Sequence, residues 1–148
     1  MGKVRSTREL AARRTSVRVP EVIFPLSLRM LWPPLTANKV WVPWGSNGHV
    51  GLSLRAEAKQ YFENVNVDLL VQRVPRHRLA MALEVELTYH PPKCRRADID
   101  NVGPLVLDAL TKACVWEDDE WITRLVQTRL EAVDTPHVDV TIRPRVAP

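Results

Sequence analysis

The sequence predicts a single α+β (α/β) domain, in which a mixed β-sheet is packed by two main helices behind a basic N-terminal arm. Three observations predict this class. The chain has 148 residues, enough for one domain with a hydrophobic core but not for two. Residues 79–89 place a large apolar side chain at every second position, as a strand with one buried face does. Residues 53–71, and a second stretch after Gly103-Pro104, carry apolar side chains at helical spacing.

The first 20 residues form the predicted arm, and residues 21–148 form the predicted folded domain. The arm has six Lys/Arg and one Glu, a net charge of +5, whereas the whole chain carries +4. Clustered basic residues bind polyanions by releasing counterions, so the arm indicates a nucleic-acid partner. A solvated, flexible tail with no partner is the alternative interpretation.

The first predicted elements are a strand and a hairpin. The strand begins at Leu26, alternates as far as Trp32 and ends at Pro33-Pro34. The turn residues 45–48, GSNG, separate two short β-type runs, 40–42 and 49–52. This arrangement is typical of a β-hairpin.

A long amphipathic helix and a long strand follow the hairpin. Ser53 is expected to cap the helix, which extends to about residue 71. Its apolar stripe consists of Leu54, Ala58, Tyr61, Phe62, Val65 and Leu69. The strand covers residues 79–89 and ends at Pro91-Pro92. Its apolar face consists of Leu79, Met81, Leu83, Val85, Leu87 and Tyr89.

The C-terminal third contains one predicted helix and one or two strands. Pro104 suits the first turn of a helix that continues to about Cys114. Residues 121–133 fit either a helix or a strand, and residues 138–142 alternate as a strand. The predicted order is therefore strand, hairpin, helix, strand, helix, and then two strands.

Several classes of protein and site are excluded by what the sequence lacks. It has no run of about 18 apolar residues, so we expect no membrane span, and no apolar segment follows the N-terminal charges. We therefore expect an intracellular, cytoplasmic protein. Cys94 and Cys114 lack the CxxC spacing of zinc sites. The four histidines, which also lack metal spacing, are expected to be structural or surface residues. They are His49, His77, His90 and His137.

Carboxylates gather around the second predicted helix. Asp98 and Asp100 are two residues apart, so in an extended segment their side chains would project together. Two close carboxylates repel unless a cation lies between them, and Mg²⁺ prefers oxygen ligands. A third acid from the Glu117–Glu120 cluster would complete a site for phosphoryl chemistry. A helix cap at the Asp pair and a solvated acidic turn are the alternatives.

The basic residues Lys93, Arg95 and Arg96 precede the Asp pair directly. Basic side chains beside a phosphoryl-transfer site bind the phosphate backbone of a nucleic acid. We therefore expect these three residues to bind DNA.

The segments RRADIDN, LDALTKA and WEDDEW, and LWPP with Asn38, closely resemble the RusA family of Holliday junction resolvases of bacteria and their phages. The resemblance covers about residues 26–143. It implies a homodimeric α/β nuclease that uses Mg²⁺, or Mn²⁺ in its place, to make paired symmetric nicks in four-way DNA junctions. It implies no small-molecule substrate.

The resemblance also implies which residues are catalytic. The three catalytic, metal-binding aspartates of the family correspond to Asp98, Asp100 and Asp119. Asp118 is a secondary candidate, and Asp108 is expected on the helix surface. A helix over residues 104–114 is about 15 Å long, so Asp119 would leave the end remote from Asp98. Either the chain returns along the helix or a partner subunit contributes to the site.

One position departs from the pattern of the family. The family commonly has a lysine four residues after the second aspartate, and here that residue is Pro104. We expect Lys112, Lys93 or Arg96 to contact the scissile phosphate instead, with Lys112 as the candidate catalytic lysine. The alternative is a relative that binds branched DNA without cutting it.

Two further expectations concern the interface and a competing nuclease class. A two-fold dimer matches the symmetry of a four-way junction. The candidate interface residues, each also a candidate for core packing, are Trp41, Trp44, Trp116 and Trp121. The segment Glu57–Lys59 is the one E-x-K motif of a PD-(D/E)xK nuclease, but it lies on a predicted helix before the Asp pair.

Overall fold

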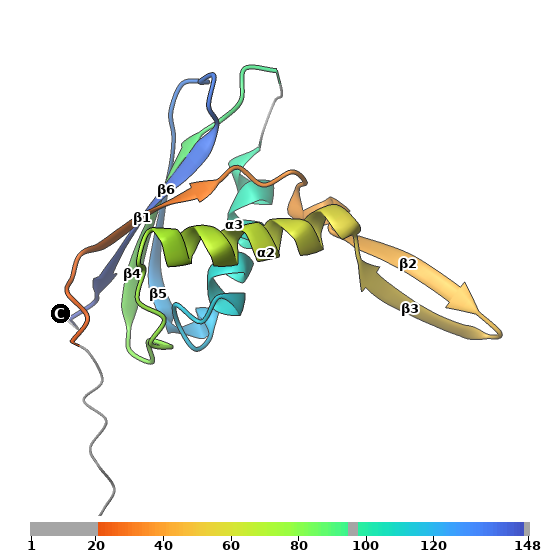
Figure 1. The fold of residues 1–148 in the computed structure, drawn as a ribbon, viewed down its shortest axis with the longest axis horizontal. Coiled ribbons are helices and arrows are strands. Elements are labelled where there is room, and N and C mark those ends of the chain that lie inside the picture. Colours follow the sequence, from red (N-terminus) through yellow and green to blue (C-terminus); the bar gives the residue numbers. More distant parts are fainter. Residues whose placement is uncertain (1–20, 95–97, 147–148) are drawn as a thin grey trace, which may run out of the picture.

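The computed structural model describes residues 21–94 and 98–146. In this part of the chain, a four-stranded sheet has the order β1-β6-β4-β5, and β2 and β3 form a separate hairpin (Figure 1). The strands are β1 Leu26–Leu31, β2 Trp41–Ser46, β3 His49–Leu54, β4 Leu83–His90, β5 Ile122–Arg129 and β6 His137–Pro144. The helices are α2 Ala56–Val71 and α3 Ile99–Lys112, with short 3-10 turns η2 Ala37–Lys39 and η3 Asp119–Trp121.

The sheet is mixed, as predicted. Strand β6 pairs antiparallel with both β1 and β4, whereas β5 pairs parallel with β4. Two parallel neighbours need a crossover connection, and α3 provides it. This connection explains why the ambiguous residues 121–133 begin as a strand, because α3 carries the chain back to the end of the sheet where β4 starts.

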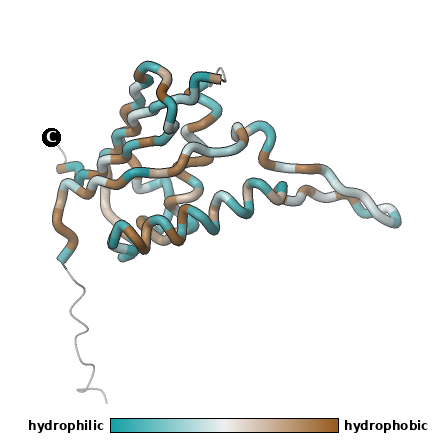
Figure 2. Tube along the Cα trace, turned by 45° about the horizontal axis from the view of Figure 1, so that its top comes forward, coloured by the Kyte–Doolittle hydropathy of each residue, from teal (hydrophilic) through white to brown (hydrophobic). Residues whose placement is uncertain are grey.

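The core lies on one face of the sheet, under α2 and α3. Alternate residues of β4 from Leu83 to Tyr89 are buried, as the sequence predicted. They pack with buried residues of β6, α2 and α3 in a single cluster. Figure 2 shows apolar and polar residues alternating along α2, in agreement with a helix that buries one side. The two predicted helices therefore cover the same face.

The opposite face of the sheet is polar and carries no helix among the described residues. On this face, β4 presents Glu84, Glu86 and His90, and β6 presents His137 and Asp139. Ion pairs link the strands across it, such as Arg124 of β5 to Glu84 at 2.7 Å. We call this surface the open face.

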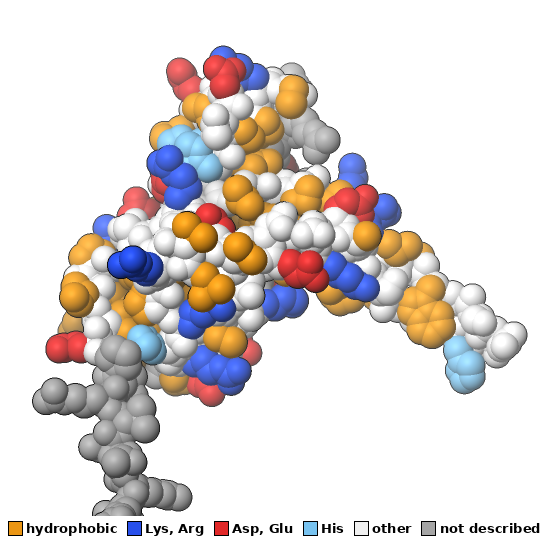
Figure 3. Space-filling view, viewed as in Figure 1, with side chains coloured by type: hydrophobic (Ala, Val, Ile, Leu, Met, Phe, Trp, Pro, Cys, Tyr) orange, Lys and Arg blue, Asp and Glu red, His pale blue; other side chains and the backbone are white. Residues whose placement is uncertain are grey.

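The β2–β3 hairpin projects away from the sheet and the two helices (Figures 1 and 3). None of its residues from Trp41 to Leu54 is charged apart from a possible charge on His49. Trp44 lies over Gly51, where an added Cβ would meet the indole ring at 2.8 Å. Trp41 and Trp44 are each half exposed, so the hairpin presents aromatic surface without Lys, Arg, Asp or Glu.

Three element boundaries differ from the predictions. Helix α2 begins at Ala56, because Ser53 belongs to β3 and pairs with Val42. Strand β4 begins at Leu83, since Leu79 makes only an isolated bridge, to Trp116. The third difference concerns α3 and bears on the site. No helix in the described part of the chain is long and apolar enough to cross a membrane.

Candidate metal-binding carboxylates on helix α3

Helix α3 begins at Ile99, five residues before the predicted start, and Asp98 is its N-cap. Asp98 Oδ1 accepts from the backbone N–H of Asp100, and Oδ2 accepts from Asn101 Nδ2, both at 3.4 Å. These distances are long for hydrogen bonds, and Asp98 and Asp100 are both exposed. The extended geometry predicted for the pair is wrong because Asp100 lies in the first helical turn. The alternative of a helix cap is confirmed.

Asp100, Pro104 and Asp108 follow one another at steps of four residues along α3. Residues four apart lie on the same helix face, and each step advances about 6 Å along the axis. All three are exposed. Pro104 is the sixth residue of α3, not a first-turn residue, so the helix lacks the hydrogen bond from position 104 to the Asp100 carbonyl. We call this surface the acidic face of α3. As predicted, Asp108 lies on the helix surface.

Helix α3 ends in a turn that sends the chain back along it. Cys114 has a φ of 62°, its N–H donates to the Thr111 carbonyl, and Val115 N–H donates to the Leu110 carbonyl. This pattern is a Schellman motif with cysteine in the position that glycine usually takes. Trp116 then anchors the returning segment, because it is fully buried and its Nε1 donates to Thr111 Oγ1 at 2.6 Å.

The returning chain brings Asp119 to the acidic face. Residues Asp119–Trp121 form η3, which packs against α3. Asp119 lines a pocket of about 430 Å³ together with Pro104 and Asp108. The same pocket is lined by Ala37, Val40, Trp41, Leu105 and Leu107. Asp119 was expected to reach the site either by a return of the chain along α3 or from a partner subunit. In this structure the chain returns along its own helix.

Negative charges lie close together on this face, at Asp108, Asp118 and Asp119. A hydrogen bond with Asp118, then partial burial and the charges of Asp118 and Asp108, raise the pKa of Asp119. The pKa of Asp118 is lowered, first by the backbone N–H of Glu120, which donates to its Oδ1 at 3.1 Å. The pair therefore resists carrying two negative charges, a repulsion that a bound cation relieves.

The three predicted aspartates do not form one tight cluster. Across residues 21–94 and 98–146, one group of three ligand-type side chains has all its donor atoms within 4.8 Å, and it contains none of them. Asp119 lies beside Asp108, and about 12 Å of helix axis separates Asp108 from Asp100. The structure thus places the three aspartates along one helix, with Asp98 and Asp100 at its start and Asp119 near its middle.

Turn η2, which contains Lys39, packs against α3, and Lys39 was not among the predicted site residues. Asn38 Nδ2 donates to Asn101 Oδ1 at 2.9 Å, and η2 contacts α3. Lys39 is exposed and lies between Asn38 and Val40, which lines the pocket of Asp119. Only the tertiary structure brings η2 to α3, because 62 positions separate Lys39 from Asn101 in the sequence.

The lysines expected to replace the missing one already have carboxylate partners. Lys112 Nζ lies 3.4 Å from Asp108 Oδ2 and 4.9 Å from the centroid of the Phe62 ring. Lys93 Nζ lies 2.8 Å from Asp134 Oδ1. Of the other predicted basic residues, Arg95 and Arg96 lie outside the described residues.

Gly103 allows α3 to approach β4 and β5 closely. A Cβ at this position would meet Gln127 Oε1 at 2.6 Å and the Tyr89 hydroxyl at 2.8 Å. The Tyr89 hydroxyl donates to Gln127 Oε1 at 2.6 Å. Burial, followed by the charge of Asp100, raises the pKa of the Tyr89 phenol and keeps its proton in place. This contact fixes the position of the helix that carries Asp98 and Asp100.

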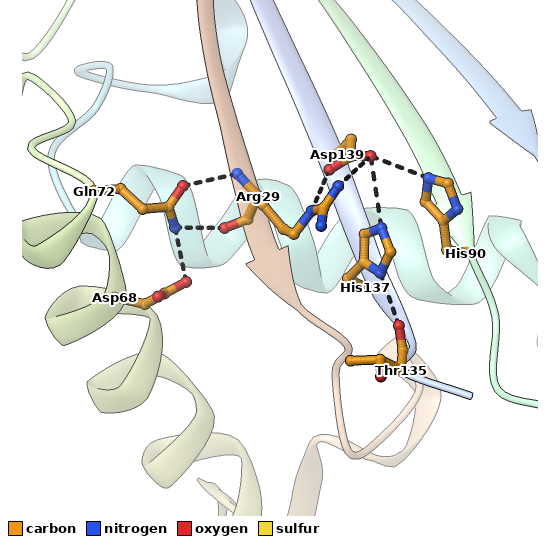
Figure 4. A network of polar contacts seen from close by, with 7 residues as sticks. All are labelled: Arg29, Asp68, Gln72, His90, Thr135, His137 and Asp139. Carbon is orange, nitrogen blue, oxygen red and sulfur yellow. Dashed lines mark hydrogen bonds and ion pairs between the residues drawn. The ribbon is translucent and has the colours of Figure 1, made fainter. Parts of the chain in front are cut away.

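Two other groups of predicted residues have different positions. Trp116 belongs to the core, Trp121 is partly buried against it, and Trp41 and Trp44 are exposed. His90 and His137, far apart in the sequence, come together with Asp139 on the open face (Figure 4). The two-residue spacing of His137 and Asp139 on a strand was the available signal, because it puts both on one face.

Comparison with known proteins identifies the family. Residues 32–143 match the family model described as Endodeoxyribonuclease RusA. Crossover junction endodeoxyribonuclease RusA of Escherichia coli K12 is 28% identical over 116 residues, which cover 78% of this chain and 92% of that protein. The protein of the same name from Escherichia coli O139:H28 is 30% identical over 117 residues, with the same two shares. That from Enterobacteria phage 82 is 28% identical over 111 residues, covering 75% of this chain and 88% of the relative. The chain belongs to the RusA endodeoxyribonuclease family.

Proposed function

We propose that this chain is a Mg²⁺-dependent endodeoxyribonuclease that resolves four-way (Holliday) DNA junctions by paired symmetric nicks, in DNA recombination and repair. One observation carries the proposal beyond family membership. The chain returns after α3, so that Asp119 lies against the same helix that begins at Asp98. This return supports the proposal, because it brings Asp119 to the helix whose start carries Asp98 and Asp100.

The donor set on this surface fits Mg²⁺ or Mn²⁺. Asp98, Asp100 and Asp119 offer exposed carboxylate oxygens, the ligand type that these hard cations prefer. Mg²⁺ typically takes one or two carboxylates and fills its remaining positions with waters and phosphate oxygens. Asp98 and Asp100 would therefore suffice to hold an ion at the start of α3. A nearby cation would relieve Asp119, whose pKa is raised by a hydrogen bond with Asp118, by burial and by like charges.

The positions of these residues indicate what each would contribute to the reaction. When bound, a divalent ion would activate a water and neutralise charge on the scissile phosphate. Asp98 and Asp100 would hold the ion, and Tyr89 and Gln127 would fix the helix that carries them. The pocket beside Asp119 would admit the DNA backbone. Lys93, Arg95 and Arg96, in the segment that leads to Asp98, would hold flanking phosphates.

A lysine from outside position 104 would supply the missing positive charge. We expect Lys39→Gln to lower single-turnover cleavage at least about tenfold, because Lys39 lies between two residues that contact α3 or line its pocket. Lys112→Gln and Lys93→Gln should have smaller effects, since each lysine already has a carboxylate partner. Binding should weaken less than cleavage in all three. Lys59→Gln on α2 is the control, and unchanged cleavage rates in all three variants would exclude this compensation.

A second candidate function is binding of branched DNA without cleavage. Pro104 favours it, since the position of the family lysine has neither a cation nor a backbone N–H. The absence of a tight aspartate cluster within the described residues also favours it.

The dimer and the basic arm complete the proposal. A homodimer would present two related sites to the two strands that must be cut. The uncharged hairpin with exposed Trp41 and Trp44 is the candidate interface, and Trp116 is excluded because it is fully buried. The arm, residues 1–20, lies outside the described residues. Its net charge of +5 would add affinity for the DNA backbone without sequence preference.

The decisive experiment uses a synthetic four-way junction with and without Mg²⁺. We expect wild-type protein to make paired nicks only with Mg²⁺, and Asp100→Asn to reduce the single-turnover rate at least about 100-fold while binding persists. Glu117→Gln, a change in the neighbouring acidic cluster, is the matched control and should cleave normally. Tight junction binding by the wild type without nicking, in Mg²⁺ or Mn²⁺, would reject the nuclease and support the second candidate.

A further inference from the structure

Two histidines and an aspartate meet on the open face of the sheet, away from α3. His90 ends β4, directly across from His137 of β6, and Asp139 follows two residues later on β6. The imidazole rings stack with their centroids 4.1 Å apart and an angle of 17° between their planes. Figure 4 shows both rings beside the Asp139 carboxylate. All three side chains are partly buried, and their donor atoms lie within 4.8 Å of one another.

The hydrogen bonds of His137 leave one ring nitrogen facing a carboxylate. His137 Nδ1 lies 2.8 Å from the backbone carbonyl of Thr135, which can only accept a hydrogen bond. The proton of the neutral ring is therefore on Nδ1, and Nε2 carries a lone pair. Nε2 is buried, has no hydrogen-bond partner, and lies 3.6 Å from Asp139 Oδ2. Two lone-pair atoms facing each other require a proton or a metal ion between them.

Two donor separations in this group bracket those of a tetrahedral ion, and one stacked ring would turn to aim its nitrogen at the same ion. Asp139 Oδ2 lies 3.0 Å from His90 Nε2 and 3.6 Å from His137 Nε2. Ligands at about 2.0–2.1 Å from a tetrahedral Zn²⁺ are about 3.3–3.4 Å apart, between these two values. The bond from His137 Nδ1–H to a carbonyl is also the arrangement that orients histidine ligands in metal sites.

Arg29 of β1 contacts both oxygens of Asp139. Its Nε donates to Oδ1 at 2.8 Å, and its Nη2 makes a longer contact with Oδ2, at 3.4 Å. Oδ2 also faces the two histidines. Gln72, which caps α2, in turn brackets the backbone of Arg29, accepting from its N–H at 2.9 Å and donating to its carbonyl at 2.6 Å. The carboxylate is thus fixed before any ion binds. The charge of Arg29 repels a cation, and this repulsion limits the affinity of the site.

We propose that His90, His137 and Asp139 form a binding site for a divalent transition metal such as Zn²⁺, separate from the carboxylates of α3. Imidazole nitrogen suits Zn²⁺, Cu²⁺ and Ni²⁺, whereas Mg²⁺ prefers oxygen. The ion would link β4 to β6, and three protein ligands would leave its fourth position for water or an added ligand. The site does not depend on the proposed nuclease activity.

The test measures metal binding by the full-length, untagged, chelator-treated protein in the absence of DNA. We expect one Zn²⁺ per chain by calorimetry, and a tetrahedral absorption spectrum when Co²⁺ replaces Zn²⁺. His90→Ala and His137→Ala should each weaken Zn²⁺ binding at least about tenfold. The controls, His49→Ala on the hairpin and Cys94→Ser, should bind normally, and excess Mg²⁺ should not displace the ion.

Two results would overturn the site: no stoichiometric Zn²⁺ binding by the wild type, or unchanged affinity in both histidine variants. The near-isosteric Asp139→Asn covers the case in which an alanine variant fails to fold, as judged by circular dichroism. It should fold and lose affinity, and normal binding by folded Asp139→Asn would also overturn the site. Because no assay involves cleavage, an inactive nuclease would leave these outcomes interpretable.

Discussion

Two regions of this molecule contain aspartates, and they shift the pKa of an aspartate in opposite directions. On the open face, partial burial alone would raise the pKa of Asp139, but the hydrogen bond and charge of Arg29, with the charges of two histidines, lower it. On the acidic face of α3, a hydrogen bond with Asp118, burial and two like charges raise the pKa of Asp119. On the open face, cationic side chains surround the carboxylate of Asp139. On the acidic face of α3, other carboxylates lie beside Asp119.

This difference distinguishes a carboxylate that connects two strands from carboxylates that are available to bind a hard cation. Asp139 joins β1 to β6 through Arg29, so its charge is paired with a cation of the same chain. Asp98, Asp100 and Asp119 are exposed and have weak or repulsive neighbours, so their charge is left to be neutralised from outside the chain. A surface that binds a hard cation such as Mg²⁺ through carboxylates alone is expected to have this unsatisfied character. A site at Asp139 would depend on the nitrogens of His90 and His137 as well.

The sharpest way to test the comparison is to remove each carboxylate. We expect Asp119→Asn to lower junction cleavage at least about 100-fold while leaving the unfolding free energy unchanged or slightly higher, because repulsion is relieved. Asp139→Asn should instead lower the unfolding free energy by about 1 kcal/mol, a value typical of partly exposed ion pairs. Single-turnover cleavage and chemical denaturation measure the two effects. A large loss of stability in Asp119→Asn would break the distinction.

A second test gives the acidic face its own cation. Pro104→Lys places the family lysine between Asp100 and Asp108 and restores a helical N–H. We expect cleavage to rise about tenfold, and the unfolding free energy to rise by up to about 3 kcal/mol because proline is removed from the helix interior.

Pro104→Gln separates the two effects of that substitution. It should raise the stability in the same way without the charge, and so without the gain in cleavage. Equal cleavage by the lysine and glutamine variants would show that charge at this position is not what the site lacks.

The smallest expected effect is the dependence of stability on pH. The pKa of Asp139 is lowered by folding, so its contribution is complete above the unfolded pKa of about 3.9 and is lost as pH falls through the folded value. The pKa of Asp119 is raised, so its contribution is complete below about 3.9 and is lost as pH rises through the folded value. Thermal unfolding of wild type, Asp139→Asn and Asp119→Asn from about pH 3 to 7 would measure both. A stability difference between wild type and Asp139→Asn that grows toward low pH would contradict the assigned sign.

Much of the fold was determined by local sequence pattern. Strand β4 was predictable because alternating residues from Leu83 to Tyr89 must bury one side of a pleated strand. The order of strands, hairpin and helices followed from similar periodicities and from turn residues such as Asn47-Gly48. The start of α3 was mispredicted, because Pro104 suggested a first turn whereas Asp98 supplied the actual cap.

The site was only partly determined by sequence. The sequence alone identified Asp98, Asp100 and Asp119 by their likeness to a family motif, and Pro104 as the departure from it. The return of Asp119 to α3 depended on the tertiary structure, because it requires burial of Trp116 and a left-handed Cys114. The packing of η2, which contains Lys39, on α3 and the meeting of His90 with His137 also required the fold. These contacts join residues more than 40 positions apart, and strand register and helix packing, not local spacing, bring such residues together.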